Sequence, residues 1–239
     1  MENWQERTEL LIGKDKLNTL KKSHVLIAGL GGVGAMAAEM ICRAGIGNIT
    51  IIDSDKIQTS NRNRQIPALV STEGKCKTEV VSERLMDINP DLKLIAINKY
   101  LKDEEIPNIL TAQKFDYVVD AIDTLSPKVF FIYHALKLDL KLVSSLGTGR
   151  KFDPELVKVV DISETYNCKL GYYLRKRLHK LEIYSNFKVV FSPEDVNIGS
   201  VELIANERNK KSRVGTISYM PAIFGCHAAS VVIRDLIGV

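Results

Sequence analysis

The 239-residue sequence contains few cysteines, and none of them stand at the short spacing that binds a structural metal ion. Cys42, Cys76, Cys168 and Cys226 are far apart and form no C-x-x-C pair. A zinc ribbon needs such pairs, and a disulfide framework needs several closely spaced cysteines in a small secreted chain. Both are therefore disfavoured, and we expect reduced thiols that mostly pack in the interior.

Long apolar runs and a secretion signal are also missing. No apolar run approaches the length needed to span a bilayer, and the first ten residues, M-E-N-W-Q-E-R-T-E-L, mix charges without a hydrophobic signal core. We therefore expect a cytoplasmic protein without a membrane partner. The net charge of +4 and the pI of about 8.7 are mildly basic and only weakly favour a polyanionic partner.

What the sequence does contain is an alternation of buried strands and helices. Residues 24–30 are an apolar run that ends in glycine, a helical segment of small residues follows, and 48–53 is a second run that ends in an acid. The further expected elements are strands at 92–98, 115–122 and 141–146, a helix at 74–89, and a helix with Pro127 at its first position. This order predicts an α/β protein with a doubly wound, mostly parallel, Rossmann-like sheet.

The regular alternation of strands and helices ends after Gly149. The expected elements there are short strands at 157–162 and 188–191, a basic helix at about 170–181, a loop at 205–215 and a closing helix at about 222–236. The predicted organisation is a Rossmann-like region at 1–150 and a smaller C-terminal extension at 151–239 that belongs to the same domain.

A glycine-rich turn joins the first expected strand to the first helix. Gly29, Gly31, Gly32 and Gly34 form G-x-G-G-x-G, and Asp53 ends the next strand. Glycines permit close approach of the backbone, the amino end of a helix attracts phosphate, and an acid accepts hydrogen bonds from ribose. No Gly-Lys-Ser/Thr follows, which excludes a Walker P-loop. The turn alone fits NAD as well as ATP.

Residues beyond the second strand favour ATP over NAD. The stretch S-N-R-N-R-Q brings Asn61, Arg64 and Gln65 just beyond this strand, and Lys77 starts the following helix. Hydride transfer has no need of such cations, whereas they neutralise charge that builds on a leaving pyrophosphate. Asp123 ends a central strand at the carboxyl edge of the sheet, where a carboxylate is placed to hold Mg²⁺ against phosphates.

Together, these motifs resemble the E1-like adenylating superfamily, whose members activate carboxylates as acyl-adenylates. The resemblance covers about the first 150 residues and rests on I-A-G-L-G-G-V-G, I-I-D-S-D, S-N-R-N-R-Q, G-K-C-K and D-A-I-D. It implies an adenylation domain at 1–150 that uses ATP and Mg²⁺, with Asp123 as the metal ligand. The implied nucleotide-binding residues are Gly29, Gly31, Gly32, Gly34, Asp53, Asp55, Asn61, Arg64, Gln65 and Lys77.

The superfamily also places an arginine from near the amino terminus in the active site of the neighbouring subunit. In this sequence R-T-E-L-L-I-G supplies Arg7. The resemblance therefore implies a homodimer, and Arg7 joins Arg64, Lys77 and Asp123 as a candidate catalytic residue. Without the resemblance, Arg7 would be interpreted as an exposed arginine of a terminal tail.

Two branches of the superfamily remain open. One adenylates the carboxy-terminal glycine of ubiquitin-like or sulfur-carrier proteins. The other is similar to tRNA threonylcarbamoyladenosine dehydratases, which activate a threonyl carboxylate on a modified adenosine of tRNA. The features that resemble this second branch are R-T-E-L-L-I-G, S-N-R-N-R-Q-I, S-L-G-T-G-R-K-F-D-P-E-L-V-K-V-V-D-I-S-E-T, S-Y-M-P-A-I-F-G and the missing C-x-x-C pair. They imply ATP-dependent cyclisation of threonylcarbamoyladenosine, with tRNA as the partner. A sulfur-transfer or carrier protein is the alternative partner, since not all activators of such proteins have the cysteine pair.

Charge in the carboxyl half of the chain favours tRNA. The expected basic helix carries Lys169, Arg175, Lys176, Arg177 and Lys180 together with Tyr172 and Tyr173, and E-R-N-K-K-S-R adds four bases to one acid. Cations bind a phosphate backbone through counterion release, and tyrosines stack on bases. A solvated amphipathic helix explains the same charges without a partner. A non-catalytic, nucleotide-dependent tRNA-binding module is therefore a third alternative.

Two cysteines invite interpretation as nucleophiles. Cys168 stands at the start of the basic helix, where the helix dipole favours a thiolate, and Cys226 is followed by His227. Neighbouring residues of a helix point in different directions, so we expect packing roles for both cysteines. Ring closure within an activated substrate also needs no protein nucleophile.

Overall fold

The computed structural model describes residues 4–194, 201–207 and 210–239, and its centre is a seven-stranded sheet with the order β3-β2-β1-β4-β5-β7-β6. The strands are β1 (His24–Ala28), β2 (Asn48–Ile52), β3 (Lys93–Ile97), β4 (Tyr117–Asp120), β5 (Leu142–Ser145), β6 (Lys158–Asp161) and β7 (Lys188–Phe191). All neighbouring strands in this sheet pair in parallel except β6 and β7. The predicted mostly parallel α/β fold is confirmed. The division after residue 150 stays a prediction, although β6 and β7 extend the same sheet beyond it.

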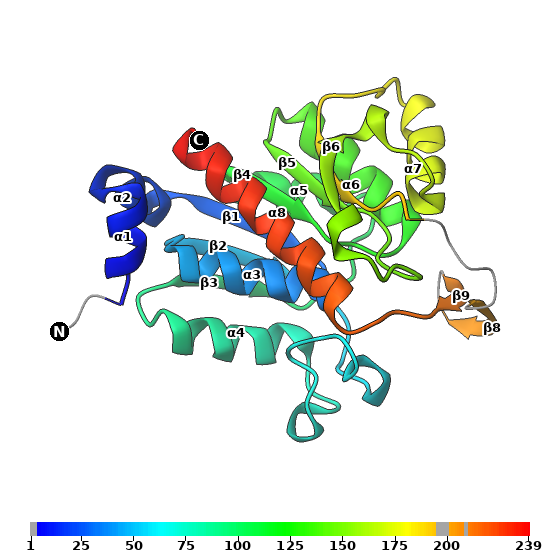
Figure 1. Ribbon diagram of the computed structural model, residues 1–239, viewed down its shortest axis with the longest axis horizontal. Helices are drawn as coiled ribbons and strands as arrows, with labels where there is room; N and C mark the ends of the chain where they lie inside the picture. The colour runs from blue at the N-terminus through cyan, green and yellow to red at the C-terminus, as the bar shows by residue number, and fades with distance from the viewer. Residues whose placement is uncertain (1–3, 195–200, 208–209) are drawn as a thin grey trace.

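Helices cover both faces of the sheet, because successive residues of each strand point to opposite sides. The helices are α1 (Glu6–Ile12), α2 (Lys14–Lys22), α3 (Gly32–Ala44), α4 (Lys77–Ile88), α5 (Ile106–Thr111), α6 (Leu125–Lys137), α7 (Lys169–His179) and α8 (Tyr219–Ile237). Val25 and Ile27 of β1 pack in one apolar cluster with α3, α4 and α8, whereas Leu26 and Ala28 pack in a second cluster with α5, α6 and α7. Figure 1 shows α8 lying alongside α3 across one face. Short 3-10 turns are η1 (Thr59–Asn61), η2 (Val70–Thr72), η3 (Pro154–Leu156) and η4 (Ile162–Glu164).

Two sequence predictions about local structure are wrong. Helix α6 begins at Leu125, so Pro127 is its third residue rather than its first. A proline is tolerated there because the first four N–H groups of a helix have no partner within it. The expected loop at 205–215 instead contains parts of an antiparallel hairpin formed by β8 (Val201–Glu207) and β9 (Lys210–Val214), while residues 208 and 209 lie outside the described part.

Helix α8 contradicts the expectation that no apolar segment is long enough to span a membrane. It has 19 residues and a mean hydropathy of 1.4, which satisfy the length and composition of a span. The helix packs into the apolar cluster with α3 through residues such as Met220, Phe224 and Val231, which are buried. Core packing thus explains its composition.

Candidate active site

The glycine-rich turn and the D-A-I-D segment lie against each other at the carboxyl edge of the sheet. Gly29 has a φ of 90°, and a Cβ at this position would lie 2.7 Å from the carbonyl oxygen of Ala121. A Cβ on Gly34 would collide with the carbonyl oxygen of Gly29. The Ala121 amide also donates to the carbonyl of Ala28 at 2.8 Å. Because β1 lies between β2 and β4, this contact marks the point where strand order reverses and α/β proteins bind ligands.

The amino end of α3 opens onto the same edge. Gly31 precedes the helix, and no side chain in the described part of the chain caps it. A Cβ added to Gly31 would meet only the side-chain nitrogen of Gln65, at 3.8 Å, so the backbone here is open to close approach. A helix of 13 residues directs its first N–H groups and its dipole toward this opening, an arrangement that binds phosphate.

Asp53, Asp55 and Lys77 form a connected group beside the turn. The two carboxylate oxygens of Asp53 accept hydrogen bonds from the amides of Leu30 at 2.6 Å and Asp55 at 2.7 Å. The buried Lys77 ammonium lies 2.7 Å from Asp55 Oδ2 and 3.9 Å from Asp53 Oδ2. Burial raises the pKa of Asp53, and Lys77 and the two amides only partly oppose this shift. The sequence prediction that these residues come together is consistent with this geometry.

Asn61 ends η1, and Arg64 and Gln65 come directly after this turn. Asn61 is buried and its Oδ1 accepts from the Gln58 amide at 3.1 Å, which fixes the turn. The Arg64 guanidinium donates to the Ser60 carbonyl at 3.0 Å. Burial lowers the pKa of Arg64, and the charge of Asp123 opposes that shift, so the two groups lie within electrostatic range. The structure therefore brings Arg64 and Asp123 together.

Gln65 carries an unsatisfied polar atom. The residue is 8% exposed, and its Oε1 is buried without a hydrogen-bond partner among the described residues. An unpaired buried acceptor costs free energy, and such atoms in native proteins call for an explanation. The position of Gln65 beside the open backbone of Gly31 points to a ligand donor as the missing partner.

Asp123 lies three residues beyond the end of β4 rather than at the end of the strand, as the sequence predicted, and is exposed at the carboxyl edge. Within the described residues, no group of three or more His, Cys, Asp or Glu side chains gathers to hold a metal ion. An all-protein metal cage is thus not formed in this part of the chain. One carboxylate completed by substrate phosphates is the arrangement that suits Mg²⁺.

Arg7 is the candidate residue that the structure does not bring to the site of its own chain. It lies exposed on α1, and the neighbouring Gln5 side chain packs beside Gly45, shortly before β2 begins. The start of β2 belongs to the amino edge of the parallel sheet, opposite the glycine turn. Figure 1 shows α1 and α2 at one end of the molecule, far from the start of α3.

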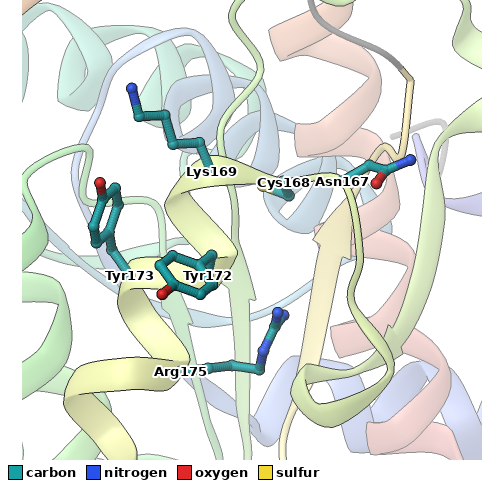
Figure 2. Close-up of a pocket in the computed structure, with 6 residues that line it drawn as sticks. All are labelled: Asn167, Cys168, Lys169, Tyr172, Tyr173 and Arg175. Carbon is teal, nitrogen blue, oxygen red and sulfur yellow. The ribbon is translucent and has the colours of Figure 1, made fainter.

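Helix α7 presents a basic and aromatic outer surface. Tyr172 and Tyr173 are 54% and 44% exposed, and their rings contact edge to face with centroids 5.3 Å apart. A hollow of about 390 Å³ lies at the start of the helix, and Figure 2 shows the side chains that line it, from Asn167 to Arg175. Within the described residues, no carboxylate forms an ion pair with the cations of α7, which are Lys169, Arg175, Lys176 and Arg177, or with Lys180 directly after it. The side chains of the second basic stretch, E-R-N-K-K-S-R, lie outside the described part.

Neither of the two cysteines considered from the sequence, Cys168 and Cys226, is supported as a nucleophile. Cys168 is buried and its sulfur accepts from the Gly171 amide at 3.4 Å, which agrees with a packing role. The packing role expected for Cys226 is wrong, because this residue faces solvent on the outer side of α8. Partial burial still raises the pKa of its thiol, which disfavours a thiolate.

One element of the site escaped the sequence analysis. Lys128 and Asp120 form a completely buried ion pair, and Asp120 is the first residue of the D-A-I-D segment, whose last residue, Asp123, is exposed. The pair joins a helix residue to a strand end, and only the tertiary structure reveals that they meet. The one signal in the sequence is that an aspartate ends an otherwise apolar strand.

Fold and site together define a protein of the Rossmann-like nucleotide-binding class, with a glycine-rich turn surrounded by cations and carboxylates. The chain belongs to the ThiF family, whose model matches residues 5–239.

Relatives with known names cover nearly the whole chain. A Bacillus subtilis (strain 168) protein named tRNA threonylcarbamoyladenosine dehydratase is 36% identical over 240 residues, which cover 97% of this chain and 93% of the relative. The crystal structure of Escherichia coli tRNA N6-threonylcarbamoyladenosine dehydratase in complex with ATP has a TM-score of 0.90 at 29% identity, covering 100% of this chain and 96% of that chain. The structure of the same protein in complex with AMP has a TM-score of 0.89 at 30% identity, covering 100% of this chain and 97% of that chain.

A relative named as an adenylyltransferase matches a shorter part of this chain. The molybdopterin-synthase adenylyltransferase of Escherichia coli (strain K12) is 36% identical over 112 residues, which cover 47% of this chain and 44% of that protein. The likeness to the dehydratases thus extends through the C-terminal part of the chain, whereas the likeness to this adenylyltransferase covers less than half of it.

Proposed function

We propose that this protein is an ATP-dependent enzyme that dehydrates N6-threonylcarbamoyladenosine in tRNA by closing a ring. The observation that carries the proposal is similarity along the whole chain to proteins of that name, one of them seen with ATP on a matching fold. The alternative, activation of a sulfur-carrier protein, has the weaker support of a match over 47% of the chain.

The residues around the turn fit ATP. The start of α3 offers backbone N–H groups to phosphate, and the open backbone at Gly31 admits a ligand. Asp53 keeps lone pairs for ribose hydroxyls although each of its oxygens already accepts one amide. The unpartnered Oε1 of Gln65 needs a donor, which hydroxyl or amino groups of the nucleotide or substrate supply.

The charges suit departure of pyrophosphate. Lys77 and Arg64 are held by neighbouring acceptors on the rim of the site, so they need little reorganisation when negative charge builds on the leaving group. Asp123 is the proposed Mg²⁺ ligand, and Mg²⁺ when bound neutralises phosphate charge. A single carboxylate on the protein side fits this metal, which usually keeps waters and phosphate oxygens as its other ligands.

In the proposed reaction, the threonyl carboxylate attacks the α-phosphorus of ATP and pyrophosphate leaves. A nitrogen or oxygen of the carbamoyl group then attacks the acyl carbon, AMP leaves, and a carbamoyl N–H gives up its proton to solvent. One carboxylate oxygen leaves with AMP, so the nucleoside loses the elements of one water. The second step joins two groups of one molecule, for which correct orientation accounts for much of the acceleration.

The outer surface of α7 is the proposed contact for tRNA. A substituent on N6 of adenine occupies the base-pairing edge, so the substrate nucleoside belongs in an unpaired segment of RNA. Proteins bind such segments with cations along the backbone and aromatic rings under the bases. The cations, which form no ion pair within the described part of the chain, and the exposed Tyr172 and Tyr173 offer both. We place the protein in the cytoplasm, where ATP and tRNA are found together.

A homodimer completes the proposed site. Arg7 lies at the amino edge of its own sheet, so a contribution to catalysis requires the site of a second copy. Leu10 and Leu11 on the same helix are 80% and 85% exposed, which suits a surface that another copy covers.

A nucleoside mass measurement tests the proposal. The protein is incubated with ATP, Mg²⁺ and tRNA that carries the modified adenosine, and the digested nucleosides are analysed by mass spectrometry. We expect a nucleoside lighter by one water, together with equal amounts of AMP and pyrophosphate, and no turnover with tRNA that lacks the modification. Pyrophosphate exchange that depends on a carrier protein ending in Gly-Gly would instead favour the sulfur-carrier branch. Binding of tRNA without AMP release would indicate a non-catalytic module.

A further inference from the structure

A buried ion pair lies directly before the segment that carries Asp123, and the chemistry proposed above does not use it. Lys128 belongs to the first half of α6, and Asp120 is the last residue of β4. Both side chains are 0% exposed, and Lys128 Nζ lies 2.6 Å from Asp120 Oδ2. Two charges removed completely from water need a full set of partners to be tolerated.

Every proton of the Lys128 ammonium group has an acceptor. Besides Asp120, Nζ donates to Ser144 Oγ at 3.2 Å and to the Ser145 carbonyl oxygen at 2.9 Å. The Ser144 hydroxyl donates in turn to Asp120 Oδ2 at 2.6 Å. The network joins α6 to the last residues of β4 and β5, which pair in register at Asp120 and Ser144.

The second oxygen of Asp120 holds the chain that follows the strand. Asp120 Oδ1 accepts a hydrogen bond from the Ile122 amide at 3.0 Å. The Ala121 amide donates to Ala28 at the end of β1. Both residues between Asp120 and Asp123 are therefore fixed, one by the ion pair and the other by the strand that leads into the glycine turn.

Fold stability alone gives little reason for this arrangement. Replacing a buried ion pair by apolar residues of similar size is often neutral or stabilising. A functional carboxylate, in contrast, needs supporting hydrogen bonds that hold it within a fraction of an ångström. We infer that Asp120 is a positioning residue for adenylation: Lys128 holds Asp120 in place, and Asp120 fixes the Asp123 carboxylate through the Ile122 amide. The inference rests on the proposed role of Asp123.

The test compares two variants in which both charges are removed. The first, Asp120→Asn with Lys128→Met (the Asn/Met variant), retains a side-chain oxygen for the Ile122 amide. The second, Asp120→Leu with Lys128→Met (the Leu/Met variant), removes that acceptor as well. Both are designed in pairs because Lys128→Met alone would leave a buried carboxylate uncompensated and destabilise the fold. Thermal melting verifies that each variant is folded, and Mn²⁺ binding in the presence of ATP is measured by electron paramagnetic resonance.

We expect the Leu/Met variant to form AMP about 100-fold more slowly than the Asn/Met variant and to bind Mn²⁺ more weakly, with the KM for tRNA unchanged. Adding Asp123→Asn to the Leu/Met variant should cost much less activity than the same change costs the wild type, because both changes act through one carboxylate. Equal rates and equal Mn²⁺ affinity in the two folded variants would overturn the inference, as would a full additional loss on adding Asp123→Asn.

Two further measurements keep the result decisive. If the Leu/Met variant does not fold, Ser144→Ala removes one hydrogen bond from Asp120 and should weaken Mn²⁺ binding several-fold, whereas an unchanged affinity would contradict the inference. Glu39→Gln removes a buried carboxylate far from the site and should lower the Tm without changing the rate. Wild-type protein that binds Mn²⁺ with ATP but leaves modified tRNA intact would reject the proposed substrate and not the role of Asp120.

Discussion

Single buried atoms show where this site departs from the best packing for stability. Gln65 is the clearest case, since its Oε1 has lost contact with water and has no partner among the described residues. We predict that Gln65→Leu stabilises the ATP-free protein by about 1 kcal/mol, because an unsatisfied buried acceptor costs about that much or more. The same change should weaken ATP binding. Urea unfolding and isothermal titration measure the two effects, and a variant that is less stable and binds ATP normally would contradict the interpretation.

At the scale of elements, an acid between two helices links the helical layer. Glu39 on α3 accepts hydrogen bonds from Arg43 of the same helix at 2.9 Å and from Arg84 on α4 at 2.5 Å. Burial alone would raise the pKa of Glu39, but hydrogen bonds from Arg84 and Arg43 outweigh it and lower the pKa below its ordinary value of 4.5. Because the pKa is lower in the folded state, the carboxylate stabilises the fold above about pH 4.5, and this contribution is lost as the pH falls through the folded-state pKa.

Glu39→Gln should therefore lower the free energy of unfolding at pH 7 by about 1 kcal/mol, a value reduced because both arginines are half exposed. The difference from the wild type should shrink when the pH falls below about 4.5. Urea titrations at pH 7 and pH 4 measure it. Glu83→Gln, at an exposed position of α4, is the matched control, and an equal loss in both variants would exclude the proposed bridge.

The sequence predicts elements well where burial leaves a local pattern. The buried parallel strands appear as apolar runs, and the order of the glycines, Asp53, Arg64 and Lys77 predicts the site because neighbouring strand ends share one edge. The hairpin β8–β9 was not predicted because the stretch E-R-N-K-K-S-R has the composition of a loop, which hides the pairing of two strands that are neighbours in sequence. The Lys128–Asp120 pair also required the tertiary structure, which brings residues of α6 and β4 into contact.

At the scale of the whole molecule, the position of α7 predicts how tRNA binding depends on salt. Lys176 and Arg177 lie in its last turn, and Lys21 and Lys22 lie in the last turn of α2, at the other end of the molecule (Figure 1). Lys176→Gln with Arg177→Gln should weaken tRNA binding and reduce the slope of log affinity against log salt by about 1.5, the value for two lost phosphate contacts. Lys21→Gln with Lys22→Gln changes the same charge at the same kind of helix position and should have no such effect. Fluorescence anisotropy at several salt concentrations measures both, and equal losses would show that only net charge matters.

The last prediction concerns two copies of the chain. Arg7 stands at the amino edge of its own sheet while Asp123 stands at the carboxyl edge, so Arg7→Ala and Asp123→Asn should each abolish AMP formation through different subunits of the proposed dimer. When the two variants are co-expressed, half of the dimers are mixed, and each mixed dimer pairs an intact Asp123 with the intact Arg7 of its partner at one of its two sites. Roughly a quarter of the wild-type activity should return. If Arg7 acted within its own chain, or had no catalytic role, mixing would restore no more than the sum of the separate variants. Recovery thus depends on a site shared between subunits, which neither the fold of one chain nor the order of its motifs provides.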